Sequence, residues 1–76
     1  MPVNPEMLHV SSIALGNPRL TIVNGKRLAE GDWLVLSTHL GAASVRCIQI
    51  DDGIVRFRHG GEMLSAKLHV VEKAGH

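Results

Sequence analysis

The sequence predicts an all-β domain made of consecutive antiparallel hairpins. Three turn signals lie between runs of strand-forming residues, at residues 23–26, 51–54 and 59–62. Each places glycine where a tight reversal requires positive φ, and Asn24-Gly25 is the strongest two-residue hairpin signal among them. Roughly six or seven short strands separated by turns imply a small antiparallel β-barrel or a two-layer β-sandwich.

Side-chain alternation supports strands in the second half of the chain. Residues 55–58 read Val-Arg-Phe-Arg, so the valine and phenylalanine are expected to point inward and both arginines to solvent. The same period of two continues through residues 64–70. Residue propensities also permit a helix at residues 63–68, but the period favours a strand.

Prolines and turn clusters set the remaining boundaries. Pro2 and Pro5 deny the first residues a regular ladder, so we expect a flexible arm at residues 1–7. A single β-domain follows at residues 8–71, with a polar tail at 72–76. The expected strands cover residues 8–15, 20–23, 26–28, 33–36, 45–50, 54–58 and 64–70.

Two further expectations concern the middle of the chain and the core. Residues 37–44 contain Gly41 and small residues without a clear period, and are expected to form the longest loop. The alternation between turn signals predicts a mainly aliphatic core. Its members are Leu20, Ile22, Leu34, Leu36, Ile48, Ile50, Val55, Phe57, Leu64, Ala66 and Leu68.

Composition and charge limit the classes of function. The chain is 45% hydrophobic and 20% charged, which is ordinary globular composition. Its net charge of +1 gives no long-range field that favours a polyanion, so nucleic-acid binding is disfavoured. The longest purely apolar run, residues 33–36, is far shorter than the roughly 20 residues that span a bilayer. A domain of this size buries only roughly 60% of its unfolded surface, which favours oligomerisation or docking to a partner.

No catalytic or metal-binding signature stands out, so the sequence predicts no enzymatic activity, cofactor or metal. The histidines are scattered, without the close spacing of a metal site and without a thiolate cluster. Asp51 and Asp52 fit a turn better than a pair of catalytic carboxylates. Ser11, Ser12 and Cys47 lack the local signature of an activated nucleophile.

Basic residues could form one surface if the hairpins lie side by side. These residues are Lys26, Arg27, Arg56, Arg58 and Lys67. A solvated sheet face is the favoured interpretation, because single-stranded nucleic-acid platforms also need stacking aromatic residues. The chain has only Trp33 and Phe57.

The segment at residues 33–36 is apolar on both faces. Leu34 and Leu36 are expected to lie opposite Trp33 and Val35, which could form an apolar patch at a partner contact. For Trp33 itself, packing in the core is favoured, because apolar side chains are more often packed than functional. The candidate partner contacts are Trp33, Val35, Arg56 and Arg58.

The order of turns and strands resembles a family of small periplasmic β-domains. The matching segments are residues 13–18, the Leu-Thr-Ile-Val-Asn-Gly-Lys run at 20–26, the Glu-Gly-Asp at 30–32, residues 45–50, residues 53–55 and the turn at Gly61. Together they span about residues 10 to 70, and they are similar to the GspC homology region, the GspB domain and PilP of type II secretion and type IV pilus assembly. Val23 stands where isoleucine is commoner, and residues 37–44 exceed the expected turn.

This resemblance implies a non-catalytic docking module in the periplasm. Such a module joins an inner-membrane assembly to a secretin-type outer-membrane partner or to a sister component, and the family is anchored upstream of this domain. Since the sequence contains no such anchor, either the chain is an excised domain or the resemblance is only architectural. Two alternatives stay open: a small β-barrel that binds nucleic acid, and a homo-oligomeric structural protein.

Overall fold

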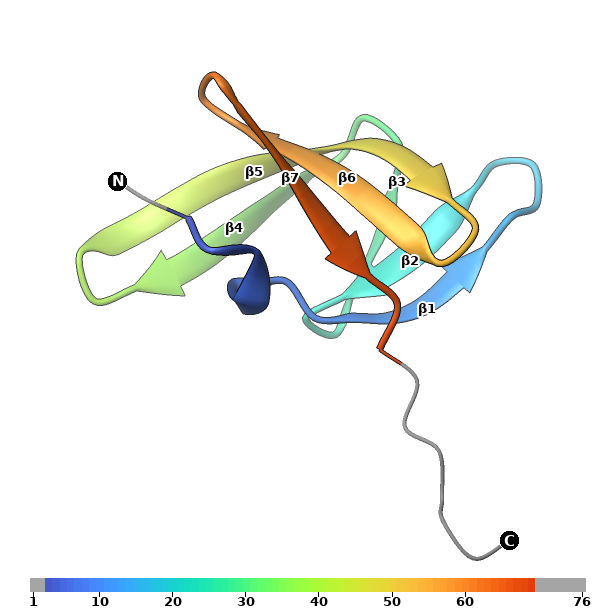
Figure 1. Cartoon of the computed structure of the whole chain (residues 1–76), viewed down its shortest axis with the longest axis horizontal. Coiled ribbons are helices and arrows are strands. Elements are labelled where there is room, and N and C mark those ends of the chain that lie inside the picture. The colour runs from blue at the N-terminus through green and yellow to red at the C-terminus, as the bar shows by residue number, and fades with distance from the viewer. Residues whose placement is uncertain (1–2, 70–76) are drawn as a thin grey trace, which may run out of the picture.

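The computed structural model describes residues 3–69, which fold into two antiparallel sheets (Figure 1). The first has the order β1-β2-β3 and contains β1 (Val10–Ala14), β2 (Leu20–Val23) and β3 (Lys26–Ala29). The second has the order β4-β5-β6-β7 and contains β4 (Trp33–Thr38), β5 (Gly41–Asp51), β6 (Ile54–His59) and β7 (Glu62–Lys67). The prediction of a small all-β fold built of hairpins is confirmed.

A backbone seam joins the two sheets where β1 meets the end of β7. Val10 of β1 forms a parallel bridge with Leu68, just after β7, and its carbonyl accepts a hydrogen bond from the His69 N–H at 2.9 Å. The connection from β3 to β4 extends the ladder of the second sheet, since the Gly31 N–H donates to the Cys47 carbonyl at 2.7 Å and the Cys47 N–H donates to the Asp32 carbonyl at 2.8 Å. Backbone hydrogen bonds therefore close the sandwich on the side of β1 and β7.

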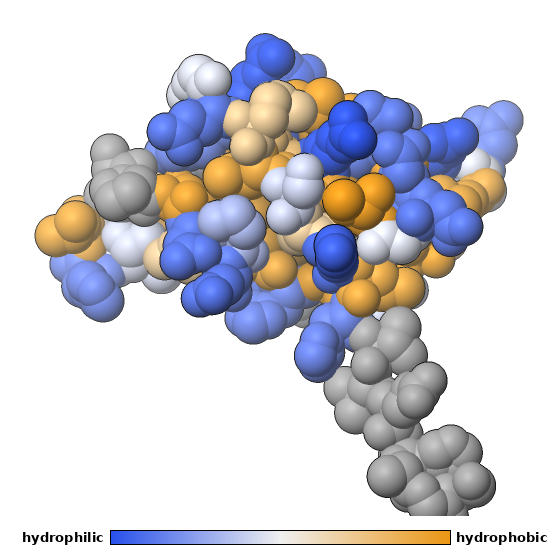
Figure 2. Space-filling model, viewed as in Figure 1, coloured by the Kyte–Doolittle hydropathy of each residue, from blue (hydrophilic) through white to orange (hydrophobic). Residues whose placement is uncertain are grey.

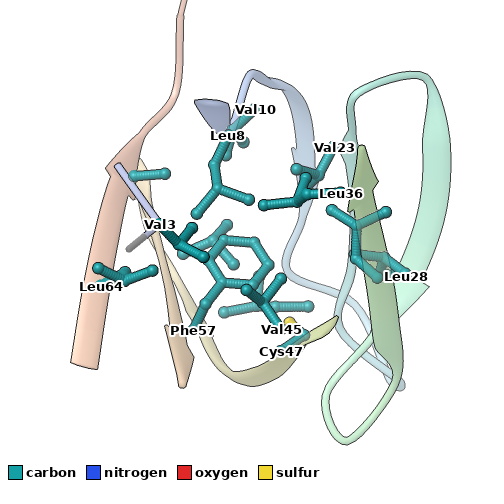
Figure 3. Packing of buried hydrophobic residues seen from close by; sticks show 14 of the residues in the cluster. Val3, Leu8, Val10, Val23, Leu28, Leu36, Val45, Cys47, Phe57 and Leu64 are labelled. Atoms are coloured by element: carbon teal, nitrogen blue, oxygen red, sulfur yellow. The ribbon is translucent and has the colours of Figure 1, made fainter. Parts of the chain in front are cut away.

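The core lies between the two sheets, with Phe57 near its centre (Figure 3). Phe57 is fully buried, and the predicted core residues Leu34, Leu36, Ile50, Val55, Leu64 and Ala66 are buried with it. The sequence did not predict the burial of Val3, Leu8, Val10, Thr21, Val23, Leu28, Ala43, Val45 and Cys47. Leu68 is only partly buried but packs against this cluster.

The predicted inward face of β2 is wrong. Thr21 and Val23 are buried, whereas Ile22 is 37% exposed and Leu20 is partly exposed. The threonine tolerates burial because its Oγ1 donates to the carbonyl of Ser12 at 2.7 Å. β2 has Leu20 and Ile22 on one face and Thr21 and Val23 on the other, so its alternation favoured the more apolar face, which is the outward one.

The predicted burial of Ile48 is wrong, because a β-bulge interrupts the alternation of β5 at this residue. The register of β5 against β6 shifts between Cys47 and Gln49, so Ile48 is the additional residue. Cys47 and Ile50 are therefore both buried although three positions separate them, and Ile48 is only partly buried. A strict period of two fails at this point.

The prediction of a long loop at residues 37–44 is also wrong. β4 continues to Thr38 and β5 starts at Gly41, which leaves only a two-residue turn between them. The Thr38 hydroxyl accepts a hydrogen bond from the Leu40 N–H at 3.1 Å and donates to the Gly41 carbonyl at 2.8 Å. This side chain stabilises a turn that lacks the Asn-Gly signal.

The expected arm at residues 1–7 is folded where the structure describes it. Val3 is buried, and Pro5–Met7 forms a short 3-10 helix, η1, capped by the side chain of Asn4. The side-chain amide of Asn24 also donates to the Met7 carbonyl at 3.0 Å, while its oxygen accepts the His9 N–H at 2.8 Å. Hydrophobic burial and these bonds hold the segment in place. The predicted tail at residues 72–76 lies outside the described residues.

Candidate functional site

β4 has one edge that pairs with no other strand of the described chain, because it is the terminal strand of its sheet. Thr38 and Gly41 form the pair that closes its turn to β5. Since hydrogen-bonded and non-hydrogen-bonded pairs alternate along an antiparallel ladder, every second residue of β4 bonds its backbone to β5. The residues between them, Trp33, Val35 and Ser37, direct their N–H and C=O groups away from β5. This row of free backbone groups can accept another strand.

Hydrophobic side chains accompany these backbone groups. Trp33 is 56% exposed, Val35 is 59% exposed and Leu40, in the turn after β4, is 71% exposed. Figure 2 shows hydrophobic surface at the tip where β4 and β5 are joined, next to hydrophilic residues. The favoured core position of Trp33 is therefore wrong, because the inward side of β4 is filled by Leu34 and Leu36. Trp33 and Val35 lie together on the accessible side, as a partner contact requires.

Arg46 of β5 covers part of Trp33. The two residues are directly opposite each other, and the guanidinium carbon lies 5.7 Å from the centroid of the Trp33 ring. This distance is that of a cation–π interaction. Arg46 was not predicted as a contact residue, although its position between the inward-facing Val45 and Cys47 indicated that it faces solvent.

We call the solvent side of the four-stranded sheet the outer face. One row across it consists of residues directly opposite one another: Trp33 of β4, Arg46 of β5, Arg58 of β6 and Met63 of β7. Arg56 lies two residues from Arg58 on the same face, and Lys67 lies at the far edge on β7. The predicted contacts Arg56 and Arg58 thus share the face of Trp33 and Val35.

The predicted basic surface is divided by the fold. Arg56, Arg58 and Lys67 lie on the outer face, but Lys26 and Arg27 lie on β3 of the other sheet. The cationic group of the outer face consists instead of Arg46, Arg56, Arg58 and Lys67.

The side chains that could bind a metal or act as nucleophiles lie apart from one another. Among residues 3–69, no three His, Cys, Asp or Glu side chains gather as metal ligands. Cys47 is fully buried, and burial raises the pKa of its thiol from 9.0 to about 11, with the carboxylates of Glu30 and Asp32 adding to the shift. Ser11 and Ser12 lie exposed on β1, on the other sheet. Asp51 accepts hydrogen bonds from Arg19 and Gln49.

Within residues 3–69 no helix has the length and hydrophobicity needed to cross a membrane. Comparison with known proteins finds no matching family model, no matching curated protein and no matching solved structure.

Proposed function

We propose that this chain is a non-catalytic protein-docking module that takes up an extended segment of another protein along β4. The observation that carries the proposal is the edge itself. β4 ends its sheet, and Trp33 and Val35 are more than half exposed beside its free backbone groups. Exposed hydrophobic edge strands are sites where another chain adds by main-chain hydrogen bonds.

The two kinds of contact have different roles at such an edge. Backbone groups of Trp33, Val35 and Ser37 give affinity for any extended strand, whereas the side chains on the outer face select its sequence. Aromatic and arginine side chains are also the residues that most often dominate binding energy at protein interfaces. The Trp33 and Arg46 stack supplies both.

We further propose that the module belongs to a secretion or pilus assembly complex in the periplasm. Support comes from the resemblance of residues 10 to 70 to the GspC, GspB and PilP domains. On this proposal the partner is a secretin-type protein or a sister component of the assembly.

A proline at the β4 edge tests the proposal. Val35→Pro removes an N–H that points away from β5, and the matched control Ser65→Pro makes the same change at the other end of the sheet, on β7. Both proteins are compared in pull-downs with purified periplasmic secretin domains, and their folding is followed by thermal melting.

We expect Val35→Pro to lose binding while Ser65→Pro keeps it, with both variants folded. Equal binding by both variants would exclude the β4 edge as the docking site. If no secretin domain binds the unmodified protein, the assembly context is wrong.

One observation favours nucleic acid as a second candidate partner. The outer face combines four cations with an exposed tryptophan, and single-stranded nucleic acids bind surfaces of this composition. Binding to an oligonucleotide with steep salt dependence would support this candidate, because phosphate contacts release counterions. The third alternative, a homo-oligomer, would raise the mass measured by sedimentation.

A further inference from the structure

The guanidinium of Arg46 is held beside the free edge of β4. The Trp33 ring lies against it, and its Nε donates to the carbonyl of Gly31 at 3.3 Å. Within residues 3–69 neither Nη of Arg46 forms a hydrogen bond. A planar guanidinium fixed in this way can bind a carboxylate through two N–H groups without ordering a free side chain.

No carboxylate of residues 3–69 forms an ion pair with Arg46, although Glu30 and Asp32 flank Gly31, whose carbonyl Arg46 binds. Arg46 and Arg58 are directly opposite on neighbouring strands, and like charges in that arrangement are destabilising. The ion pair that residues 3–69 do form joins Arg19 to Asp51 and includes none of the outer-face cations. A negatively charged partner would relieve this repulsion.

We infer that the segment that docks on β4 is an acidic protein strand, with a carboxylate side chain beside Trp33 and Arg46. This inference rests on the proposed edge docking and specifies its partner. Val35 lies two residues from Trp33 on the same face, so the partner residue beside Val35 is aliphatic. The recognised pattern is one acidic and one aliphatic residue, separated by a single position.

Charge and geometry favour this partner over two others. A second copy pairing through β4 would extend the same sheet and bring a second cationic outer face to the same side. A nucleic acid would use the cations but not the free N–H and C=O groups of Trp33, Val35 and Ser37. An acidic strand satisfies both the charges and the backbone groups.

Synthetic peptides of six residues, the length of β4, test the inference. One peptide carries glutamate and valine two positions apart with threonine elsewhere, and in the matched peptide lysine replaces glutamate. Trp33 is the single tryptophan of the chain, so its fluorescence reports binding at this edge. The protein variants are Arg46→Gln, Arg46→Glu and, as a control on the far strand, Lys67→Gln.

We expect the glutamate peptide to bind about five-fold more tightly than the lysine peptide at low salt. Arg46→Gln removes this preference, Arg46→Glu reverses it, and Lys67→Gln retains it. Val35→Pro weakens both peptides, because both depend on the edge.

Several results would overturn the inference. Equal affinity for both peptides, both lost in Val35→Pro, would reject the acidic partner and keep edge docking. A preference for glutamate that Val35→Pro leaves unchanged would instead reject edge docking. Binding of neither peptide, tighter binding of a thymidine oligonucleotide, or a dimer in sedimentation that peptide does not dissociate would each reject the acidic strand.

Discussion

The carboxylate of Glu30 accepts a hydrogen bond from the backbone N–H of Ile50 at 2.9 Å. Ile50 follows the bulge in β5, beyond the part of that strand that pairs with β4. Its carbonyl is also bound by a side chain, since Arg19 Nη1 donates to it at 2.8 Å. Two charged side chains near the three-stranded sheet thus replace the missing neighbour strand and connect the sheets.

Glu30→Ala is therefore expected to destabilise the fold. It leaves the N–H of the fully buried Ile50 without its acceptor, at a cost of about 2 kcal/mol in the free energy of unfolding. Glu30→Gln keeps an acceptor oxygen and should lose less. Urea unfolding measures both, and Glu62→Ala, at an exposed residue of β7, is the control. Equal stability of the Glu30→Ala and Glu62→Ala proteins would contradict the role of Glu30.

Gly25→Val is expected to destabilise the protein through the backbone of the β2–β3 turn. Asn24 and Gly25 have φ values of 52° and 79°, as a type I′ turn requires. A β-branched residue at positive φ costs about 1–3 kcal/mol. Apart from the two chain neighbours of Gly25, no atom lies within 4 Å of the position of an added Cβ, so the effect would come from φ and not from a tertiary contact.

Gly61→Val is the matched control for this turn. Its added Cβ also meets nothing within 4 Å, but its φ is not positive. Thermal melting should show a lower midpoint for Gly25→Val than for Gly61→Val. Equal midpoints would mean that positive φ at Gly25 does not limit stability.

The sequence predicted the hairpins because turn chemistry is local. Asn24-Gly25 and the alternation at residues 55–58 each determine a conformation within a few residues, and both predictions are confirmed. Local signals could not predict the bulge at Ile48, and Ile50, two residues after it, is bonded by Glu30 and Arg19 from distant parts of the chain. These contacts exist only after the sheets have met.

The candidate site was predicted in part, for a similar reason. Alternation placed Trp33 and Val35 on one face, and Leu34 and Leu36 fill the other. The choice between core and solvent for Trp33 depended on which face of β4 would meet the core, and that is a property of the whole fold. Pairing of Trp33 with Arg46 likewise required the register of β4 against β5.

Cys47 is expected to make stability depend on pH in the alkaline range. Burial raises the pKa of its thiol from 9.0 to about 11, so the unfolded chain releases the thiol proton at lower pH than the folded protein does. The stabilisation is complete below pH 9 and is lost as the pH rises toward about 11. Urea midpoints should fall across this range, and less steeply in Cys47→Ala.

Thiol reactivity provides a second measurement of the same burial. Thiolate is the reactive form, so Cys47 should react with an alkylating reagent at pH 8 only after urea unfolds the protein. Rapid alkylation of the folded protein would contradict the buried position of this residue.

Trp33→Ala is expected to separate docking from folding. Because Trp33 is 56% exposed, its truncation should change the free energy of unfolding by less than about 1 kcal/mol. Phe57→Ala, at a fully buried position, should cost about 3–5 kcal/mol. Circular dichroism during urea unfolding compares the two variants without relying on tryptophan fluorescence.

In a pull-down with any partner that requires the β4 edge, Trp33→Ala should lose binding while remaining folded. A loss of stability close to that of Phe57→Ala would place Trp33 in the core, and unchanged binding by a folded Trp33→Ala protein would remove this side chain from the docking surface.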